Sequence, residues 1–268
     1  MTRRDPTQAL SFGRAVGDYD RGRPRYPDAA VDWVLAQTLG RLGPTHAAAG
    51  PLDALDVGAG TGKFTASLLE RGLNVTAVEP DPVMRSRLTE AFGGRFGAAL
   101  NDVEGTAEAL PVPAASADLI SFAQSWHWVD ITRASAETAR VLRPGGTLAL
   151  VWNIRDDSAE WVAELGAIMG TSSAERFDSI NPPVGAPLHP YAHADFYWDN
   201  TITRESLLAM VTSRSYVIAL QPDARAEMLR MIELLLDEHP HLAGRTSYLL
   251  PYVTRVTLVD TLGRANVI

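Results

Sequence analysis

Three glycines and one carboxylate in the first third of the chain have the spacing of a nucleoside-binding site. Gly58, Gly60 and Gly62 alternate directly after an apolar run that ends at Val57. This pattern predicts a strand that ends in a tight turn before a helix, and glycine lets the backbone of such a turn approach a ligand closely. A second apolar run ends at Glu79. Because neighbouring parallel strands end at the same edge of a sheet, we expect the Glu79 carboxylate beside the turn, where it can accept hydrogen bonds from both hydroxyls of a ribose.

Spacing and charge disfavour two common kinds of nucleotide site. The dinucleotide-binding pattern requires a third glycine three residues after the second, where this chain has Lys63. The P-loop requires glycine in place of Val57 and serine or threonine in place of Phe64. The acidic pair Asp56 and Glu79 instead suits a ligand that carries ammonium and sulfonium charges better than it suits a pyrophosphate. These residues therefore favour S-adenosylmethionine as the cofactor.

The segment Asp56 to Gly62 resembles the first motif of class I S-adenosylmethionine-dependent methyltransferases, and Glu79 matches their ribose-binding acid. Further motifs of that family follow in order along the chain. The adenine-side loop, the fourth strand and the turn with the fifth strand are matched by residues 105–111, 118–124 and 141–151. The flanking segments Tyr19 to Pro27 and Trp126 to Trp128 narrow the resemblance to small-molecule enzymes of methyltransferase type 11, similar to trans-aconitate methyltransferase.

The resemblance implies a set of cofactor-binding residues. One departure is Thr106, where many relatives have aspartate, so we expect the contact to the adenine amino group to be weaker or to come from the backbone. Arg23 is expected to pair with the methionine carboxylate of the cofactor, because a guanidinium matches two carboxylate oxygens. The predicted cofactor-binding residues are Tyr19, Arg23, Asp56, Gly58, Gly60, Gly62, Glu79, Pro80, Met84, Thr106, Ala107, Glu108 and Gln124.

His127 is the candidate general base. It directly follows the fourth strand, and ligands of open α/β sheets bind at the carboxyl ends of the strands. Methyl transfer is an in-line displacement at a carbon bonded to a positively charged sulfur, so alignment and exclusion of water matter most and a base adds to them. Imidazole suits proton removal from a hydroxyl or a carbon acid near neutral pH. A carboxylate acceptor would need only Arg155 or Arg23 to orient it, and His127 would then orient substrate without acting as a base.

Aromatic and polar residues around these motifs are candidates for the acceptor pocket. Trp126 and Trp128 are two apart on a segment interpreted as extended, so both are expected on one side as an apolar wall. Several aromatic rings favour a planar or cyclic acceptor. The polar arm of residues 1–26 is expected to close over the cofactor as a lid. The candidate substrate-binding residues are Tyr26, Trp126, Trp128, Asn153, Arg155 and Tyr216.

Strands alternate with helices from Leu52 to Asn153, which predicts a doubly wound parallel sheet. Later residues predict helices over 158–170, 204–213 and 225–238 and strands over 196–203 and 248–258. We interpret residues 1–268 as a single α/β methyltransferase domain with a Rossmann-like, seven-stranded, mostly parallel sheet and a helical cap. Its expected parts are the arm (1–26), the cofactor-binding core (27–155), and the cap helices with the last two strands (156–268).

Composition limits the partners. The 268 residues are 46% hydrophobic, enough for one large domain, and the net charge of −8 disfavours nucleic acid. The chain has no cysteine for disulfides or thiolate metal sites, and no apolar stretch of the roughly 20 residues that a membrane span needs. His189 and His193 are separated by Pro190 and lack further ligands, so no metal is expected. The arginines near the N-terminus precede no apolar signal segment. We expect a cytoplasmic monomer or homodimer with a small-molecule substrate.

Two other functions stay open at this point. One is an NAD-dependent oxidoreductase, which would bind a nicotinamide dinucleotide at the glycine turn. The other is a noncatalytic cofactor-binding protein, which would bind S-adenosylmethionine tightly but leave no space beside its methyl group.

Overall fold

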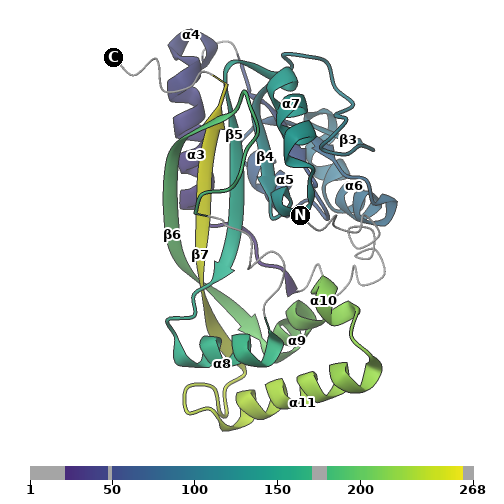
Figure 1. Ribbon diagram of the computed structural model, residues 1–268, viewed down its shortest axis with the longest axis vertical. Coiled ribbons are helices and arrows are strands. Elements are labelled where there is room, and N and C mark those ends of the chain that lie inside the picture. The colour runs from purple at the N-terminus through teal and green to yellow at the C-terminus, as the bar shows by residue number, and fades with distance from the viewer. Residues whose placement is uncertain (1–21, 48–49, 171–179, 262–268) are drawn as a thin grey trace. The chain divides into compact units, whose positions relative to one another are not determined.

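A seven-stranded sheet organises the part of the protein that the structure describes. The computed structural model describes residues 22–47, 50–170 and 180–261. The strands lie in the order β3-β2-β1-β4-β5-β7-β6 (Figure 1), and the pairs β1–β2, β1–β4, β2–β3 and β4–β5 are parallel. This order confirms the predicted Rossmann-like α/β fold with a mostly parallel sheet. The strands are β1 (Asp53–Val57), β2 (Asn74–Val78), β3 (Leu100–Val103), β4 (Ala117–Ala123), β5 (Leu142–Arg155), β6 (His189–Thr203) and β7 (Ser247–Asp260).

Helices alternate with the strands in the first half of the chain, and the described part of the second half adds further helices between its long strands. The helices of the first half are α3 (Asp28–Leu42), α4 (Pro44–Ala47), α5 (Lys63–Leu69), α6 (Pro82–Phe96) and α7 (Ile131–Val141), with the short 3-10 helices η2 (Gly97–Ala99) and η3 (Trp126–Trp128). Those of the second half are α8 (Glu160–Met169), α9 (Arg204–Thr212), α10 (Ser215–Ile218) and α11 (Pro222–Glu238).

The chain divides into two compact units. The sheet unit consists of the described residues in 25–152, 180–196 and 254–261, and the cap unit of those in 22–24, 153–170 and 197–253. The long strands β5, β6 and β7 contribute residues to both units. One boundary lies between Trp152 and Asn153 within β5, and the end of β7 belongs to the sheet unit. The division of the chain into parts that we expected at residues 26 and 155 stays a prediction.

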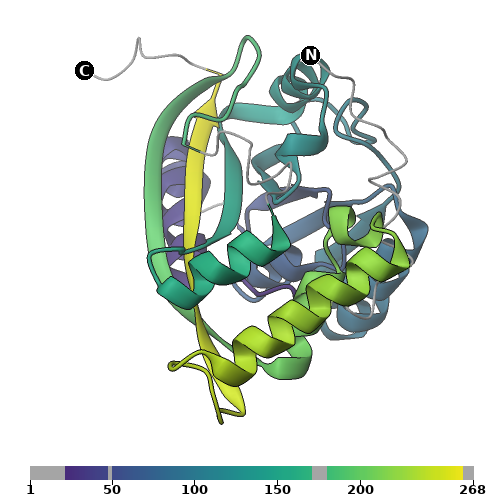
Figure 2. The ribbon, with the colours of Figure 1, turned by 60° about the horizontal axis from the view of Figure 1, so that its bottom comes forward.

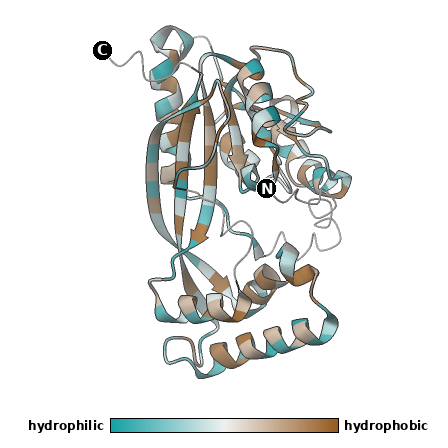
Figure 3. Cartoon of the chain, in the orientation of Figure 1, coloured by the Kyte–Doolittle hydropathy of each residue, from teal (hydrophilic) through white to brown (hydrophobic). Residues whose placement is uncertain are grey.

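The sheet unit is held by strands buried on both faces. Every residue of β4 from Ala117 to Phe122 is buried, as parallel strands covered by helices on both faces require. In Figure 3 the corresponding ribbons of β4 and β5 are mostly brown, that is, hydrophobic. Val34 of α3 and Phe64 of α5 pack with Leu119 and Val151 in one core cluster. The hydrophobic residues thus fix the strand ends that carry the candidate site.

The cap unit has a core of its own. Trp161 of α8, Met210 of α9 and Leu236 of α11 pack with Tyr252 of β7. Helices α8 and α11 lie alongside each other (Figure 2). The helices predicted over 158–170, 204–213 and 225–238 are confirmed with small shifts at their ends.

One predicted strand was too short. Strand β6 begins at His189, seven residues before the predicted start at Phe196. Its first half is polar, so it lacks the apolar pattern of a buried strand. The structure pairs these polar groups instead: the Tyr191 hydroxyl lies 3.1 Å from the Thr147 hydroxyl, and Asp195 accepts two hydrogen bonds from Arg255 at 2.9 Å.

Candidate functional site

The glycine turn and Glu79 meet at the ends of two paired strands. Val57 of β1 pairs with Val78 of β2, so the residues that follow them leave the sheet side by side. The Gly58 N–H donates to the Val78 carbonyl at 2.8 Å, and the Gly60 N–H donates to Oε2 of Glu79 at 2.8 Å. The glycine turn and the Glu79 carboxylate therefore lie side by side, as predicted, and the hydrogen bond from Gly60 joins them directly.

The backbone of the turn needs glycine. Gly58, Gly60 and Gly62 have φ angles of +68°, +58° and +85°, a region that other residues avoid. A Cβ on Gly58 would lie 2.7 Å from the Cβ of Ser125, and one on Gly62 would lie 2.8 Å from Cγ of Leu88. The turn is thus packed tightly between Ser125, the second residue after β4, and helix α6.

Ser125 is a residue that sequence reasoning missed. Its hydroxyl donates to the Val57 carbonyl at 2.7 Å, which joins the end of β4 to the end of β1 under the turn. No local signal marks this serine, because its role depends on the strand order of the sheet.

Glu79 is buried and held at both oxygens. Oε1 accepts the Asp81 N–H at 2.9 Å while Oε2 accepts the Gly60 N–H. Burial raises the pKa of the Glu79 carboxyl, the two backbone hydrogen bonds oppose this, and the neighbouring Asp81 and Asp56 add to the rise. Each carboxylate oxygen can accept a second hydrogen bond, so the fixed carboxylate keeps capacity for two hydroxyl donors.

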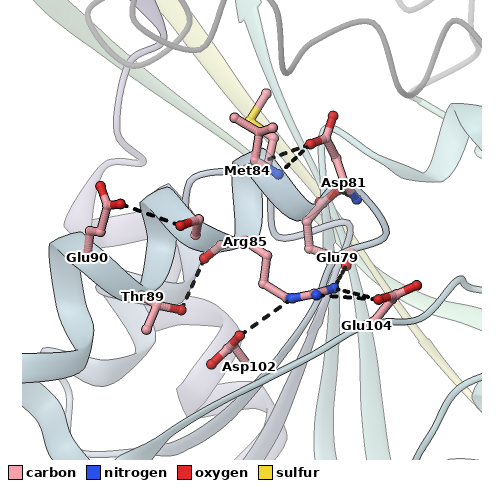
Figure 4. Close-up of polar contacts among 10 residues, drawn as sticks. Glu79, Asp81, Met84, Arg85, Thr89, Glu90, Asp102 and Glu104 are labelled. Carbon is pink, nitrogen blue, oxygen red and sulfur yellow. Dashed lines mark hydrogen bonds and ion pairs between the residues drawn. The ribbon is translucent and has the colours of Figure 1, made fainter.

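Helix α6 fixes the end of β2 (Figure 4). Asp81 caps the helix by accepting from the N–H groups of Val83 at 2.8 Å and Met84 at 3.2 Å, and Pro82 occupies the first turn. An aspartate before a proline is a known signal for a helix start, so sequence reasoning could have found this cap.

Arg85 of the same helix connects β2 with β3. It donates to the Glu79 carbonyl at 3.3 Å and forms ion pairs with Glu104 at 3.4 Å and Asp102 at 3.6 Å (Figure 4). These contacts fix the backbone from which the Glu79 carboxylate projects.

Asp56 lies beneath the turn, fully buried. Its Oδ2 accepts from the Thr65 hydroxyl at 2.6 Å and its Oδ1 from the Ser121 hydroxyl at 2.8 Å. Burial raises the pKa of the Asp56 carboxyl and these hydrogen bonds lower it in part. The geometry gives Asp56 a structural task, the connection of β1 to α5 and β4, and its direct contact with a cofactor stays a prediction.

The adenine-side loop is anchored to helix α7. Oε1 of Glu108 accepts the Asp130 N–H at 2.8 Å, and the Leu110 N–H donates to Glu137 at 2.9 Å. The Arg140 guanidinium holds the pKa of the Glu137 carboxyl below its usual value. Thr106 is exposed and Ala107 is buried beside it. Glu108 therefore positions the loop, and the adenine contacts of the loop stay a prediction.

The residues after β4 form a turn of 3-10 helix, so the expectation that Trp126 and Trp128 lie on an extended segment was wrong. Trp126 is 0% exposed and its Nε1 donates to the Pro183 carbonyl at 2.9 Å, whereas Trp128 keeps exposed surface. The indole points into the core because the backbone curls directly after Gln124, which has a φ of +62° and donates to the Val151 carbonyl.

His127 is 4% exposed, and the centre of its ring lies 5.0 Å from that of Trp128. The structure thus places His127, Gln124 and Trp128 together at the carboxyl end of β4, next to the serine that supports the glycine turn.

The remaining predicted residues are distributed over both units. In the sheet unit, Tyr26 packs edge-on against Phe64 with ring centres 4.9 Å apart, Met84 is buried, and Pro80 is half-buried. The cap unit holds Arg23, Asn153, Arg155 and Tyr216. Tyr19 and most of the predicted lid lie outside the described residues. The roles of all these residues in binding stay predictions.

No helix within residues 22–47, 50–170 and 180–261 is long and apolar enough to cross a membrane. The same part of the chain holds no group of three or more His, Cys, Asp or Glu residues that could bind a metal ion.

Several known proteins are similar in sequence to this chain. Residues 55–150 match the family model of a methyltransferase domain. A protein of Mycobacterium tuberculosis described as an uncharacterized methyltransferase is 43% identical over 94% of this chain and 96% of its own. A malonyl-[acyl-carrier protein] O-methyltransferase of Pectobacterium atrosepticum is 31% identical over 69% of this chain and 68% of its own.

The fold also has solved relatives. A structure described as that of a type II methyltransferase from Anaeromyxobacter dehalogenans matches 89% of this chain and 97% of its own, with a TM-score of 0.61 and 22% identity.

Proposed function

Because this chain belongs to the class I S-adenosylmethionine-dependent methyltransferases, we propose that it binds S-adenosylmethionine at the glycine turn and transfers its methyl group to a small-molecule acceptor. The observation that carries the proposal is the hydrogen bond between the Gly60 N–H and the buried Glu79 carboxylate. This hydrogen bond holds a carboxylate that can accept hydrogen bonds from two hydroxyl groups. The glycine backbone beside it carries no Cβ that would obstruct a ligand. This arrangement fits the ribose of the cofactor.

The cofactor would supply an activated methyl group on a sulfonium sulfur. Glu79 would bind the ribose, and the backbone of Gly58 and Gly60 would allow close approach of the methionine part. Thr106 and Ala107 would contact the adenine from the loop that Glu108 anchors. The chain would accelerate the reaction mainly by alignment, for which effective-molarity arguments allow on the order of 7 to 11 kcal/mol.

His127 is proposed to take the acceptor proton or, for an acceptor that is already ionised, only to orient it. The relative named malonyl-[acyl-carrier protein] O-methyltransferase acts, by its name, on an oxygen, which supports an oxygen acceptor here. Trp128 is the candidate apolar wall of the acceptor pocket, because it keeps exposed surface beside His127. We propose a planar or cyclic acceptor on this basis.

The base role predicts a pH-dependent loss of rate. His127→Ala should lower kcat by about 10²- to 10⁴-fold near neutral pH if the imidazole removes a proton. His193→Ala is the matched control, since its side chain is 40% exposed on β6 and should leave kcat unchanged. A loss of much less than about tenfold across neutral pH would contradict the base role.

The acceptor can be identified by activity. Release of S-adenosylhomocysteine should be measured against a library of cyclic and carboxylated metabolites. Calorimetric titration with S-adenosylmethionine and NAD separates this proposal from an oxidoreductase, which would bind NAD instead. A noncatalytic protein would bind S-adenosylmethionine but release no S-adenosylhomocysteine with any acceptor.

A further inference from the structure

Two arginines of the cap unit converge on one methionine sulfur. Nη1 of Arg155, at the end of β5, lies 3.9 Å from Sδ of Met210 and 3.2 Å from Sδ of Met169. Nη2 of Arg214, two residues beyond α9, lies 3.6 Å from the same Met210 sulfur. The two guanidinium nitrogens are therefore at most 7.5 Å apart, the sum of their distances to the shared sulfur.

A thioether is a poor partner for a guanidinium. Methionine sulfur is a weak acceptor without charge, whereas arginine typically pairs with carboxylate or phosphate oxygens through several N–H groups. Arg214 forms no ion pair with any residue in the described part of the chain. Its Nε is buried and has no hydrogen-bond partner among the same residues. Burial of an N–H donor without a hydrogen-bond partner costs folding free energy, so this atom calls for an explanation.

The surroundings would strengthen the attraction of an anion. Met169 and Met210 are almost completely buried in the cap core, so their sulfurs provide apolar surface in contact with the two guanidinium groups. Electrostatic interactions are stronger in such low-dielectric surroundings than in water. A two-oxygen group that accepts each hydrogen bond at about 2.8 Å can bridge donors with this separation.

We propose that Arg155 and Arg214 form a binding site for a carboxylate or phosphate group of a small-molecule ligand. The anion would accept hydrogen bonds from both guanidinium groups, including the buried Nε of Arg214, and would balance the charge of Arg214. This site consists of cap-unit residues only, and its occupation does not depend on the methyl transfer proposed above.

Anion binding can be measured without the cofactor. Thermal unfolding and calorimetry are carried out with inorganic phosphate and with succinate, each compared with sodium chloride at the same ionic strength. Arg214→Gln tests the site, and Arg230→Gln is the matched control because Arg230 is exposed on α11 of the same unit and pairs with Glu227. Wild type and Arg230→Gln should bind one of the two anions and unfold at a higher Tm with it.

The variant should lose this response. Arg214→Gln should bind at least about tenfold more weakly and show less than half of the Tm rise, since it keeps one amide donor but loses the charge and the fork. Binding of succinate alone identifies a carboxylate site, and binding of phosphate alone a phosphate site. An equal Tm rise in all three proteins would reflect general ion exclusion and overturn the proposal, as would the absence of binding to wild type.

A second variant guards against a folding defect. If Arg214→Gln does not fold, Arg214→Lys retains the charge and should bind the anion with intermediate affinity. Wild-type affinity in the lysine variant, which lacks the guanidinium fork, would contradict the proposed geometry.

Discussion

Replacement of Glu79 by glutamine should weaken cofactor binding more than it destabilises the fold. The carboxylate accepts the N–H groups of Gly60 at 2.8 Å and Asp81 at 2.9 Å. A glutamine amide can accept only one of them through its oxygen, and its NH₂ group would face the other donor. One buried N–H left unsatisfied costs about 1 to 3 kcal/mol of folding free energy.

Part of that cost is offset. Burial raises the pKa of Glu79, so its charge is unfavourable in the free protein and removal of the charge relieves this. We therefore expect a net loss of stability of roughly 1 kcal/mol. Cofactor binding has no such offset, because both ribose hydroxyls lose a charged acceptor. Hydrogen bonds to charged groups contribute about 1.5 to 3 kcal/mol, so the Kd for S-adenosylmethionine should rise roughly 10- to 100-fold.

Calorimetric titration of purified Glu79→Gln with S-adenosylmethionine measures the change, and urea unfolding measures its stability. Glu104→Gln is the matched control: it is the same substitution at an acidic side chain that pairs with Arg85, and that side chain is 74% exposed. Its Kd should stay within about threefold of wild type, since exposed ion pairs contribute little. A Kd of Glu79→Gln within about threefold of wild type would refute the assignment of Glu79 to the ribose.

Two further predictions concern stability. Gly58→Ala and Gly72→Ala both place a side chain at positive φ, which costs about 1 to 2 kcal/mol, but only the Cβ at position 58 also meets Ser125 at 2.7 Å. Urea unfolding should therefore show a loss for Gly58→Ala that exceeds that of Gly72→Ala by at least about 1 kcal/mol, and equal losses would mean that the turn is not tightly packed. Because burial raises the pKa of Asp56 above its ordinary value of 3.8, the native state takes up a proton before the unfolded chain as the pH falls, and the contribution of this group to the free energy of unfolding rises. As the pH falls toward the ordinary value of 3.8, the free energy of unfolding should increase more in wild type than in Asp56→Asn, and parallel curves would contradict the role of burial.

The contact between the glycine turn and Glu79 was predictable because it depends on few geometric facts. Parallel strands that follow each other in sequence usually lie side by side, and both runs end in residues that suit one ligand. The same reasoning placed His127 at the end of β4. Local patterns of this kind contain the information for strand ends.

Contacts that arise from packing across the sheet were not predictable in this way. The hydroxyls of Thr65 and Ser121 occupy both oxygens of Asp56, and nothing in the sequence shows that they point toward it. Trp126 turns into the core because the chain curls into a 3-10 helix, where an extended segment was expected. The first half of β6 was missed because polar pairs stabilise it where a hydrophobic alternation was sought.

The central claim is that Glu79 and the glycine turn bind S-adenosylmethionine. A crystal structure of the protein with this cofactor tests the claim most directly. We predict the two ribose hydroxyls within about 3.2 Å of the Glu79 carboxylate and the methionine part against Gly58 and Gly60. Cofactor bound elsewhere on the chain, with the Glu79 carboxylate contacting only Gly60 and Asp81, would contradict it.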